Sequence, residues 1–175
     1  MPVMLRRIDR FGRRYMGSKS NALIKGITLD EIIPLLDSLY AYEMVATHYS
    51  LAVLNRLEGQ ASIVLEDAFN EKVKQHFEHA RAIANRISRL GGAITGDPSL
   101  LVEISPTQNF SLPKSNADVR EILSHTLQQL QVGIRAYGDV MARLKDKDEV
   151  TYHLLLDVLK DHIDSEDEIE VSLVD

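Results

Sequence analysis

Two histidines three residues apart, His76 and His79, stand in the stretch QHFEHARA, which has the character of a helix. Residues at this spacing share one helix face. A neutral imidazole is a good ligand for iron, zinc, copper or nickel, so the pair is a candidate for a metal site. The same spacing also suits two histidines packed in a helical core. Which interpretation applies depends on the polar residues that other helices bring to the same face.

Two further polar residues interrupt apolar helical stripes elsewhere in the chain. Glu43 lies about one turn after Leu39, and His162 lies about one turn after Val158. Burial of an unpaired carboxylate costs several kcal/mol, so Glu43 requires a cation nearby or a shifted pKa. Each interruption falls near the middle of its helical pattern, where the helices of a bundle would be level with one another.

These positions make a candidate ligand set for one divalent metal ion: Glu43, His76, His79 and His162, with Gln131 as a marginal fifth member. The alternative is that Glu43 pairs with a protonated histidine, or that some of these side chains face solvent. Four polar side chains near one level, on three different helices, favour the metal site.

Four long helical patterns position these residues, because apolar side chains recur at helical spacing along each of them. Thr28 and Glu31 form the sequence signature of a capping box at the start of the first pattern. Gly91 and Gly92 predict a left-handed cap at the end of the second. The patterns cover, in chain order, residues 28–57, 59–90, 116–144 and 148–173.

The connection between the second and third patterns, residues 91–115, differs from its surroundings. It holds six prolines or glycines, is longer than the usual helix–helix loop, and has one short helical turn in PSLLVEIS. No strand pattern or internal repeat is present. Two helical hairpins joined by a long crossover predict an all-α four-helix bundle over residues 27–175.

The first 26 residues form a basic arm in front of this bundle. They carry seven Arg or Lys and one acid, a net charge of +6, which leaves −12 for the remaining residues of a chain with net charge −6. Such an arm can neutralise phosphates on nucleic acid or on an anionic membrane. It can equally be a solvated tail, or lie across the acidic surface of its own or a neighbouring subunit.

The composition limits the classes of protein to which the chain can belong. With 175 residues, 45% of them hydrophobic, the chain suits one compact domain. The absence of cysteine excludes disulfides, thiolate zinc sites and cysteine nucleophiles. No apolar run approaches the roughly 20 residues that span a membrane, and the start has no apolar core of a signal peptide. We therefore expect a cytoplasmic protein without a membrane partner.

Four segments, one in each helical pattern, have a familiar sequence character: LLDSLYAYEMVATHY, HFEHARAIANRISRLGGAI, DVREILSHTLQQLQVGIRAYGDVMARL and LLLDVLKDHIDSEDEIEVSL. They resemble the ferritin-like superfamily, particularly bacterioferritins and the Dps-like proteins. The resemblance covers about residues 28–173. It implies a ferritin-like four-helix bundle with a long crossover between the second and third helices.

The di-iron centre of that family uses a glutamate from the first helix, a Glu-x-x-His pair from the second, a glutamate from the third and a second Glu-x-x-His pair from the fourth. Only Glu43 and His79 keep the family's residue types. The third-helix position becomes Gln131 if the register shifts by one. By resemblance, the six positions fall on Glu43, His76, His79, Leu130, His162 and Ser165.

The loss of carboxylates argues for a single metal ion, because Glu43 alone cannot neutralise two. Asp161, Asp164 and Glu166 lie off the inward stripe and would reach the centre only if the last helix were rotated.

Two other sites of the family have no counterpart in this sequence. Phe77 stands where bacterioferritins carry the haem-binding methionine, so no haem is expected. Arg81 and Asn85 stand where Dps proteins carry the acid pair of their intersubunit iron site.

The resemblance implies a Dps-like iron-binding protein for iron oxidation, storage or detoxification, with a degenerate metal site inside each subunit. Iron is the expected ion, with another divalent metal as the alternative, and ferroxidase-like oxidoreductase activity is left open. The expected assembly is a homo-oligomer, a dodecameric shell, with DNA binding through the basic arm. The alternative function is a shell-forming structural or DNA-binding Dps-like protein without ferroxidase activity.

Overall fold

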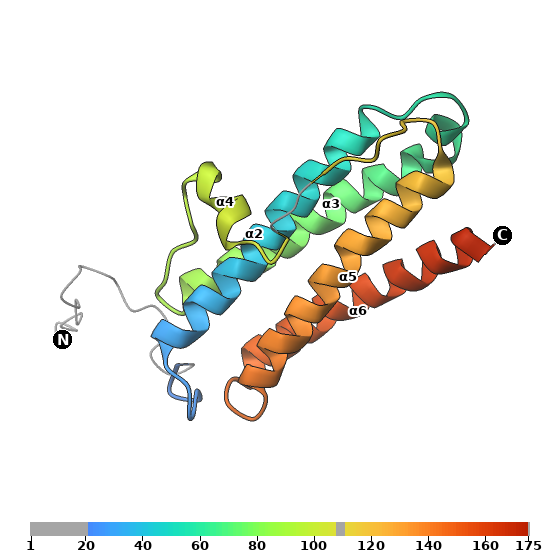
Figure 1. The fold of residues 1–175 in the computed structure, drawn as a ribbon. Coiled ribbons are helices and arrows are strands. Elements are labelled where there is room, and N and C mark those ends of the chain that lie inside the picture. The colour runs from blue at the N-terminus through green and yellow to red at the C-terminus, as the bar shows by residue number, and fades with distance from the viewer. Residues whose placement is uncertain (1–20, 108–110, 175) are drawn as a thin grey trace, which may run out of the picture.

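The computed structural model describes residues 21–107 and 111–174, and the helices in this part of the chain build a bundle (Figure 1). No strand occurs in the described residues, which confirms the all-α prediction. Among the described residues, no helix combines the length and the apolar character needed to cross a membrane. The helices are α2 (Leu29–Leu54), α3 (Gly59–Arg89), α4 (Pro98–Ile104), α5 (Val119–Leu144) and α6 (Glu149–Val174).

The four long helices form two hairpins. α2 packs chiefly against α3, and α5 packs chiefly against α6. Figure 1 shows the crossover returning along the bundle between the end of α3 and the start of α5, so α3 and α5 run in the same direction. The short helix α4 lies in this crossover and packs against α2. The predicted four-helix bundle with a long crossover between its second and third long helices is therefore confirmed.

The helix ends follow the local sequence signals. Glu31 accepts a hydrogen bond from the backbone N–H of Thr28 at 2.8 Å, so the predicted capping box is formed. Gly91 has a φ of 86°, and the N–H of Gly92 donates to the carbonyl of Ile87 at 3.0 Å. This is the left-handed cap predicted for the glycine pair.

Two helices are shorter than predicted by three residues at one end, because side chains there satisfy the terminal backbone groups. The first helix is predicted to reach residue 57, whereas α2 ends at Leu54, where the side chain of Asn55 donates to the carbonyl of Leu51 at 2.7 Å. The third is predicted from residue 116, whereas α5 begins at Val119. Its cap is Asp118, whose carboxylate accepts the backbone N–H of Glu121, in the first turn, at 3.0 Å.

The buried side chains form two apolar clusters, and the level between them is polar. On α3, the apolar cluster members Phe69 and Ile83 lie on either side of the two histidines. On α6, Val158 belongs to one cluster and Ile169 to the other, with His162 between them. The bundle therefore has an apolar core at each end and a polar layer near its middle.

A buried ion pair fixes the far end of α3 against the start of α6. Both carboxylate oxygens of Asp148 accept from Arg86 at 3.0 Å, and Arg86 also donates to Thr151 at 2.7 Å. Nearby, the N–H of Lys25 donates to the carbonyl of Lys147 at 2.9 Å, and Ile24 packs against the core. Residues 1–20, most of the predicted basic arm, lie outside the described residues, so the division at residue 26 stays a prediction.

Candidate metal centre

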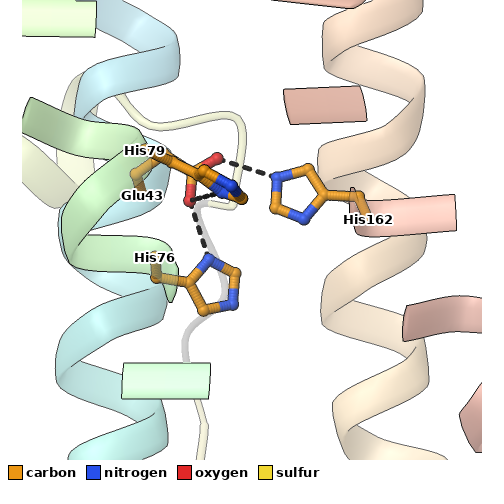
Figure 2. Close-up of side chains that lie close together, drawn as sticks. All are labelled: Glu43, His76, His79 and His162. Atoms are coloured by element: carbon orange, nitrogen blue, oxygen red, sulfur yellow. Dashed lines mark hydrogen bonds and ion pairs between the residues drawn. The ribbon is translucent and has the colours of Figure 1, made fainter. Parts of the chain in front are cut away.

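Four side chains meet in the polar layer (Figure 2). Glu43 comes from α2, His76 and His79 come from successive turns of α3, and His162 comes from α6. One ligand atom from each residue lies within 4.8 Å of those of the other three, and all four residues are buried. The sequence thus identified the four residues that the fold brings together.

Glu43 is the centre of the hydrogen-bond network. Its Oε2 accepts from Nδ1 of His76 at 2.7 Å, and its Oε1 accepts from Nε2 of His162 at 2.8 Å. The hydroxyl of Tyr137 donates to the same Oε1 at 2.5 Å. The side chain of Glu43 has no exposed surface, so these donors replace the water that a carboxylate would otherwise bind.

The two ring nitrogens of His79 differ in their contacts within the described residues. Its Nε2 donates to Oδ2 of Asp161 at 3.0 Å. Its buried Nδ1 has no hydrogen-bond partner among the described residues and lies 3.7 Å from Oε2 of Glu43. With the proton on Nε2, the lone pair of Nδ1 is free inside the cluster, which is the arrangement that a carboxylate imposes on a metal-binding histidine.

The contact from Asp161 adds a role that the sequence did not predict. Asp161 was expected to reach the centre only if α6 were rotated, and it is not among the four residues whose ligand atoms converge. It instead binds the opposite nitrogen of the His79 ring. The exposed fraction of the Asp161 side chain is 51%, so this carboxylate lies on the solvent side of the His79 ring. It acts on the centre only through that imidazole. Sequence periodicity treats a residue beside the stripe as outward, but it cannot show that a neighbouring helix places a histidine within reach.

Two buried tyrosines border the centre and were not predicted as part of it. Helical spacing places Tyr137 on the apolar stripe of its helix, although a buried tyrosine hydroxyl usually needs a partner. That requirement was the available signal. Tyr42 packs its ring edge-on against His76 and His162, with ring centroids 6.3 and 5.9 Å away. The two tyrosines therefore limit how far the imidazoles can turn.

The charges of the network favour an ionised Glu43. Burial by itself raises the pKa of Glu43, but attraction to His162 and the hydrogen bonds from the histidines hold this pKa well below its ordinary value of 4.5. Burial lowers the pKa of His76 from 6.5, despite its bond to Glu43. Burial, and then the negative charge of Glu43, raise the pKa of Tyr137 well above 10.0. An anionic carboxylate beside a neutral His76 results.

The pKa of His79 shifts in the opposite direction to that of His76. Burial, the largest single influence, lowers its pKa, but Glu43 and Asp161 together outweigh burial and raise the pKa above 6.5. Protonation of His79 therefore competes with metal binding, because both use the lone pair of Nδ1.

The donor set fits a single divalent ion. Three imidazole nitrogens and one carboxylate oxygen are ligands that zinc and iron accept. A tetrahedral shell with bonds of about 2.1 Å has ligand–ligand edges of roughly 3.4 Å. The contacts of 2.7 and 2.8 Å from Glu43 to His76 and His162 are shorter than this. Metal binding therefore requires these two imidazoles to lose their hydrogen bonds to Glu43 and to move slightly apart.

The charge balance also limits the site to one ion. Glu43 in the cluster and Asp161 behind His79 together offset the two positive charges of one divalent ion. A second ion would lack such compensation. The third-helix position of the family holds Leu130, which is buried and apolar, and the last position holds Ser165. Gln131, the marginal fifth candidate, donates from its amide to Glu166 at 2.9 Å.

Comparison with known proteins adds a family match to this geometry. The family model for the ferritin-like domain matches residues 33–175. A curated relative, the DNA protection during starvation protein of Pyrococcus furiosus, is 28% identical over 145 residues, which cover 81% of this chain and 76% of the relative.

Solved structures share the fold at lower sequence identity. The bacterioferritin-related protein of Bacteroides fragilis, described as a dodecameric thioferritin, matches with a TM-score of 0.79 at 19% identity, over 89% of each chain. Dps from Microbacterium arborescens, in its high iron form, matches with a TM-score of 0.77 at 12% identity, over 87% of this chain and 99% of that one.

Proposed function

Because the chain belongs to the ferritin-like family, we propose that it binds one iron(II) ion per subunit at Glu43, His76, His79 and His162 and acts in iron oxidation, storage or detoxification. One observation supports this most directly. The buried Nδ1 of His79 has no hydrogen bond inside the cluster, while a carboxylate holds the opposite nitrogen of the same ring. This is the form in which an imidazole binds a metal.

The choice of iron rests on the family and on relatives. The Microbacterium protein is described in a high iron form, and the donor set accepts iron(II). The same donor set also accepts zinc, copper and nickel, so these ions are the competitors to include in any binding measurement. With one ion per subunit, paired oxidation of two neighbouring ions is not expected at this centre.

The proposal includes assembly into a dodecameric shell. A dodecamer is described for the Bacteroides protein, whose fold this chain shares over most of its length. The net charge of −12 outside the basic arm fits a shell in which carboxylates attract iron ions.

The experiment is an iron oxidation assay on the purified protein. Iron(II) is added under air to the wild type, to a Glu43→Gln/His79→Gln variant and to buffer, and the formation of iron(III) is followed by absorbance. The proposal predicts faster oxidation with the wild type than with the variant or buffer. Equal rates in all three samples would reject an oxidising role.

The substituted ligands favour one alternative function. Leu130 and Ser165 cannot provide the carboxylate and imidazole that the family uses at these positions. If the assay shows no oxidation, we infer a structural or DNA-binding protein of the Dps type that keeps the scaffold. The curated relative from Pyrococcus is named for DNA protection, which supports this alternative.

A further inference from the structure

A small cavity lies beside the candidate metal centre, and His76 is one of the residues that line it. α2, α3 and α5 form its walls together with Thr107 of the crossover. Its volume is about 410 Å³ when the space at its open mouth is included. Of the four cluster residues, only His76 lines it, so the cavity is a separate compartment that touches the centre through one imidazole.

Two polar atoms that line this cavity have no hydrogen-bond partner among residues 21–107 and 111–174. They are Oγ1 of Thr107 and Oε1 of Gln129, and both atoms are buried. The whole side chain of Thr107 is buried, with an exposed fraction of 5% for the residue. Buried polar groups are rarely left unpaired, because each lost hydrogen bond costs about 1–3 kcal/mol. The oxygen and nitrogen of a side-chain amide exchange places by a half-turn, so the two side chains indicate a ligand that completes their hydrogen bonds.

The cavity also contains a cation without an ion pair. Lys72 lies one helical turn before His76 and lines the same space, and it forms no salt bridge within the described part of the chain. Burial lowers the pKa of Lys72, and Glu168 is the acid that acts against this effect. A partly buried ammonium group without a close carboxylate is a binding site for an anion.

The remaining lining sets the size and character of the ligand. Most of the wall surface is apolar, and Tyr42 and Leu130 contribute to it. One lysine compensates one negative charge, so a dianion such as phosphate would remain partly uncompensated. A metal ion is excluded by the ammonium group. A neutral apolar ligand would leave Lys72 and the two unpaired oxygens unsatisfied.

We propose that this cavity binds a small monocarboxylate, of the size of formate or acetate. Lys72 pairs with the carboxylate, and the hydroxyl of Thr107 donates to it. The amide of Gln129, turned so that its nitrogen faces the ligand, provides a second donor. The short alkyl part lies against Tyr42 and Leu130. Binding does not require the metal, because Glu43, His79 and His162 do not line the cavity.

The test measures acetate binding to the full chain by saturation-transfer NMR of the acetate methyl signal. Lys72→Met keeps the length of the side chain and removes its charge. Lys74→Met is the matched control, since Lys74 lies on the same helix but is exposed and pairs with Glu71. We expect saturable binding to the wild type and to Lys74→Met, and a loss of about tenfold or more in affinity with Lys72→Met.

Two further measurements keep the test decisive if Lys72→Met does not fold. Thr107→Val keeps the shape of the side chain and removes its hydroxyl, so acetate binding should weaken severalfold. Acetamide, the neutral analogue, should not displace acetate. Absence of saturable binding to the wild type, equal loss in both lysine variants, or equal competition by acetamide would each overturn the proposal.

Discussion

Glu43 organises the residues around it because it is a fully buried carboxylate with three donors. His76, His162 and Tyr137 each give it a hydrogen bond, whereas His79 is turned by Asp161 so that its Nδ1 stays free. A buried anion with no water needs positive charge or donors nearby. In the hydrogen-bonded arrangement the histidines and the tyrosine provide donors, and in the proposed iron-bound arrangement the metal provides the charge.

At the scale of single residues, the first prediction concerns Asp161. Asp161→Asn should weaken metal binding by about 10–100-fold, because the amide no longer fixes the tautomer of His79 as a carboxylate does. Isothermal titration with iron(II) or zinc measures the affinity. Asp164→Asn, an exposed acid on the same helix, is the control and should leave the affinity unchanged. Equal affinities for all three proteins would mean that Asp161 does not support the site.

The pH dependence of stability without metal is the second prediction. The pKa of Glu43 is lowered in the folded chain, so its ionised form stabilises the fold above pH 4.5, and this contribution is lost as the pH falls. The lowered pKa of His76 acts in the same direction below pH 6.5. The raised pKa of His79 acts oppositely, because its stabilisation is present below pH 6.5 and is lost as the pH rises through the folded-state pKa.

The two histidines therefore partly cancel, and the acid limb should report mainly on Glu43. Urea unfolding in EDTA across a pH series should show a shallower loss of stability below pH 4.5 for Glu43→Gln than for the wild type. Glu149→Gln, at an exposed acid on α6, should follow the wild type. Parallel curves for Glu43→Gln and the wild type would contradict the ionised state of Glu43.

The sequence predicted the four converging residues because each interrupts an apolar stripe. Periodicity gives the direction of a side chain on its own helix, and the middle of each pattern gives its level. It could not give Asp161 or Tyr137. The contact of Asp161 depends on how α6 is turned relative to α3. Tyr137 could not be recognised because tyrosine also occurs in apolar cores, where its ring rather than its hydroxyl matters.

At the scale of elements, α5 contributes none of the four candidate ligands. It contributes a glycine that lets a side chain of α2 come close to its backbone. Gly133 faces the ring of Tyr42, and a Cβ at this position would lie 2.2 Å from its hydroxyl oxygen. The missing side chain makes room for the ring of Tyr42, which packs against His76 and His162 and lines the cavity beside His76. Sequence patterns predicted the helix but not this role, because a glycine inside a helical pattern reads only as a weak helix former.

Alanine at two glycines of α5 should therefore have opposite effects. Gly133→Ala should destabilise the protein by about 1–3 kcal/mol, because the added methyl group overlaps with Tyr42. Gly138→Ala is the matched control, since nothing lies within 4 Å of its Cβ position, and it should stabilise by up to about 1 kcal/mol. Urea unfolding gives both values. Two stabilised variants would show that Tyr42 does not need the space at Gly133.

At the scale of the whole molecule, charge is divided between the basic arm and the rest of the chain. The first 26 residues carry +6, and the rest of the chain carries −12. Sequence composition shows this division directly, and the long crossover predicted the direction of the four helices. Assembly could not be derived in the same way, because contacts between subunits depend on the shape of a surface rather than on the pattern within one helix.

We expect the basic arm to bind DNA through phosphates. Removal of residues 1–20 should abolish retardation of DNA in a gel, while the bundle, including Ile24 and Lys25, stays intact. Binding by the full chain should weaken steeply as salt rises, because phosphate neutralisation releases counterions. A full-length variant with the five arginines of the arm changed to glutamine is the length-matched control and should also lose binding. Retardation that survives the truncation would exclude this role.

The most direct test of the metal centre is the number of iron(II) ions bound per chain after anaerobic dialysis. The wild type should bind one ion per chain at this centre. Glu43→Gln/His79→Gln should lose that ion, and His153→Gln, at an exposed histidine, should retain it. Circular dichroism verifies that the double variant is folded. Equal iron contents in the wild type and the folded double variant would contradict a metal centre at these residues.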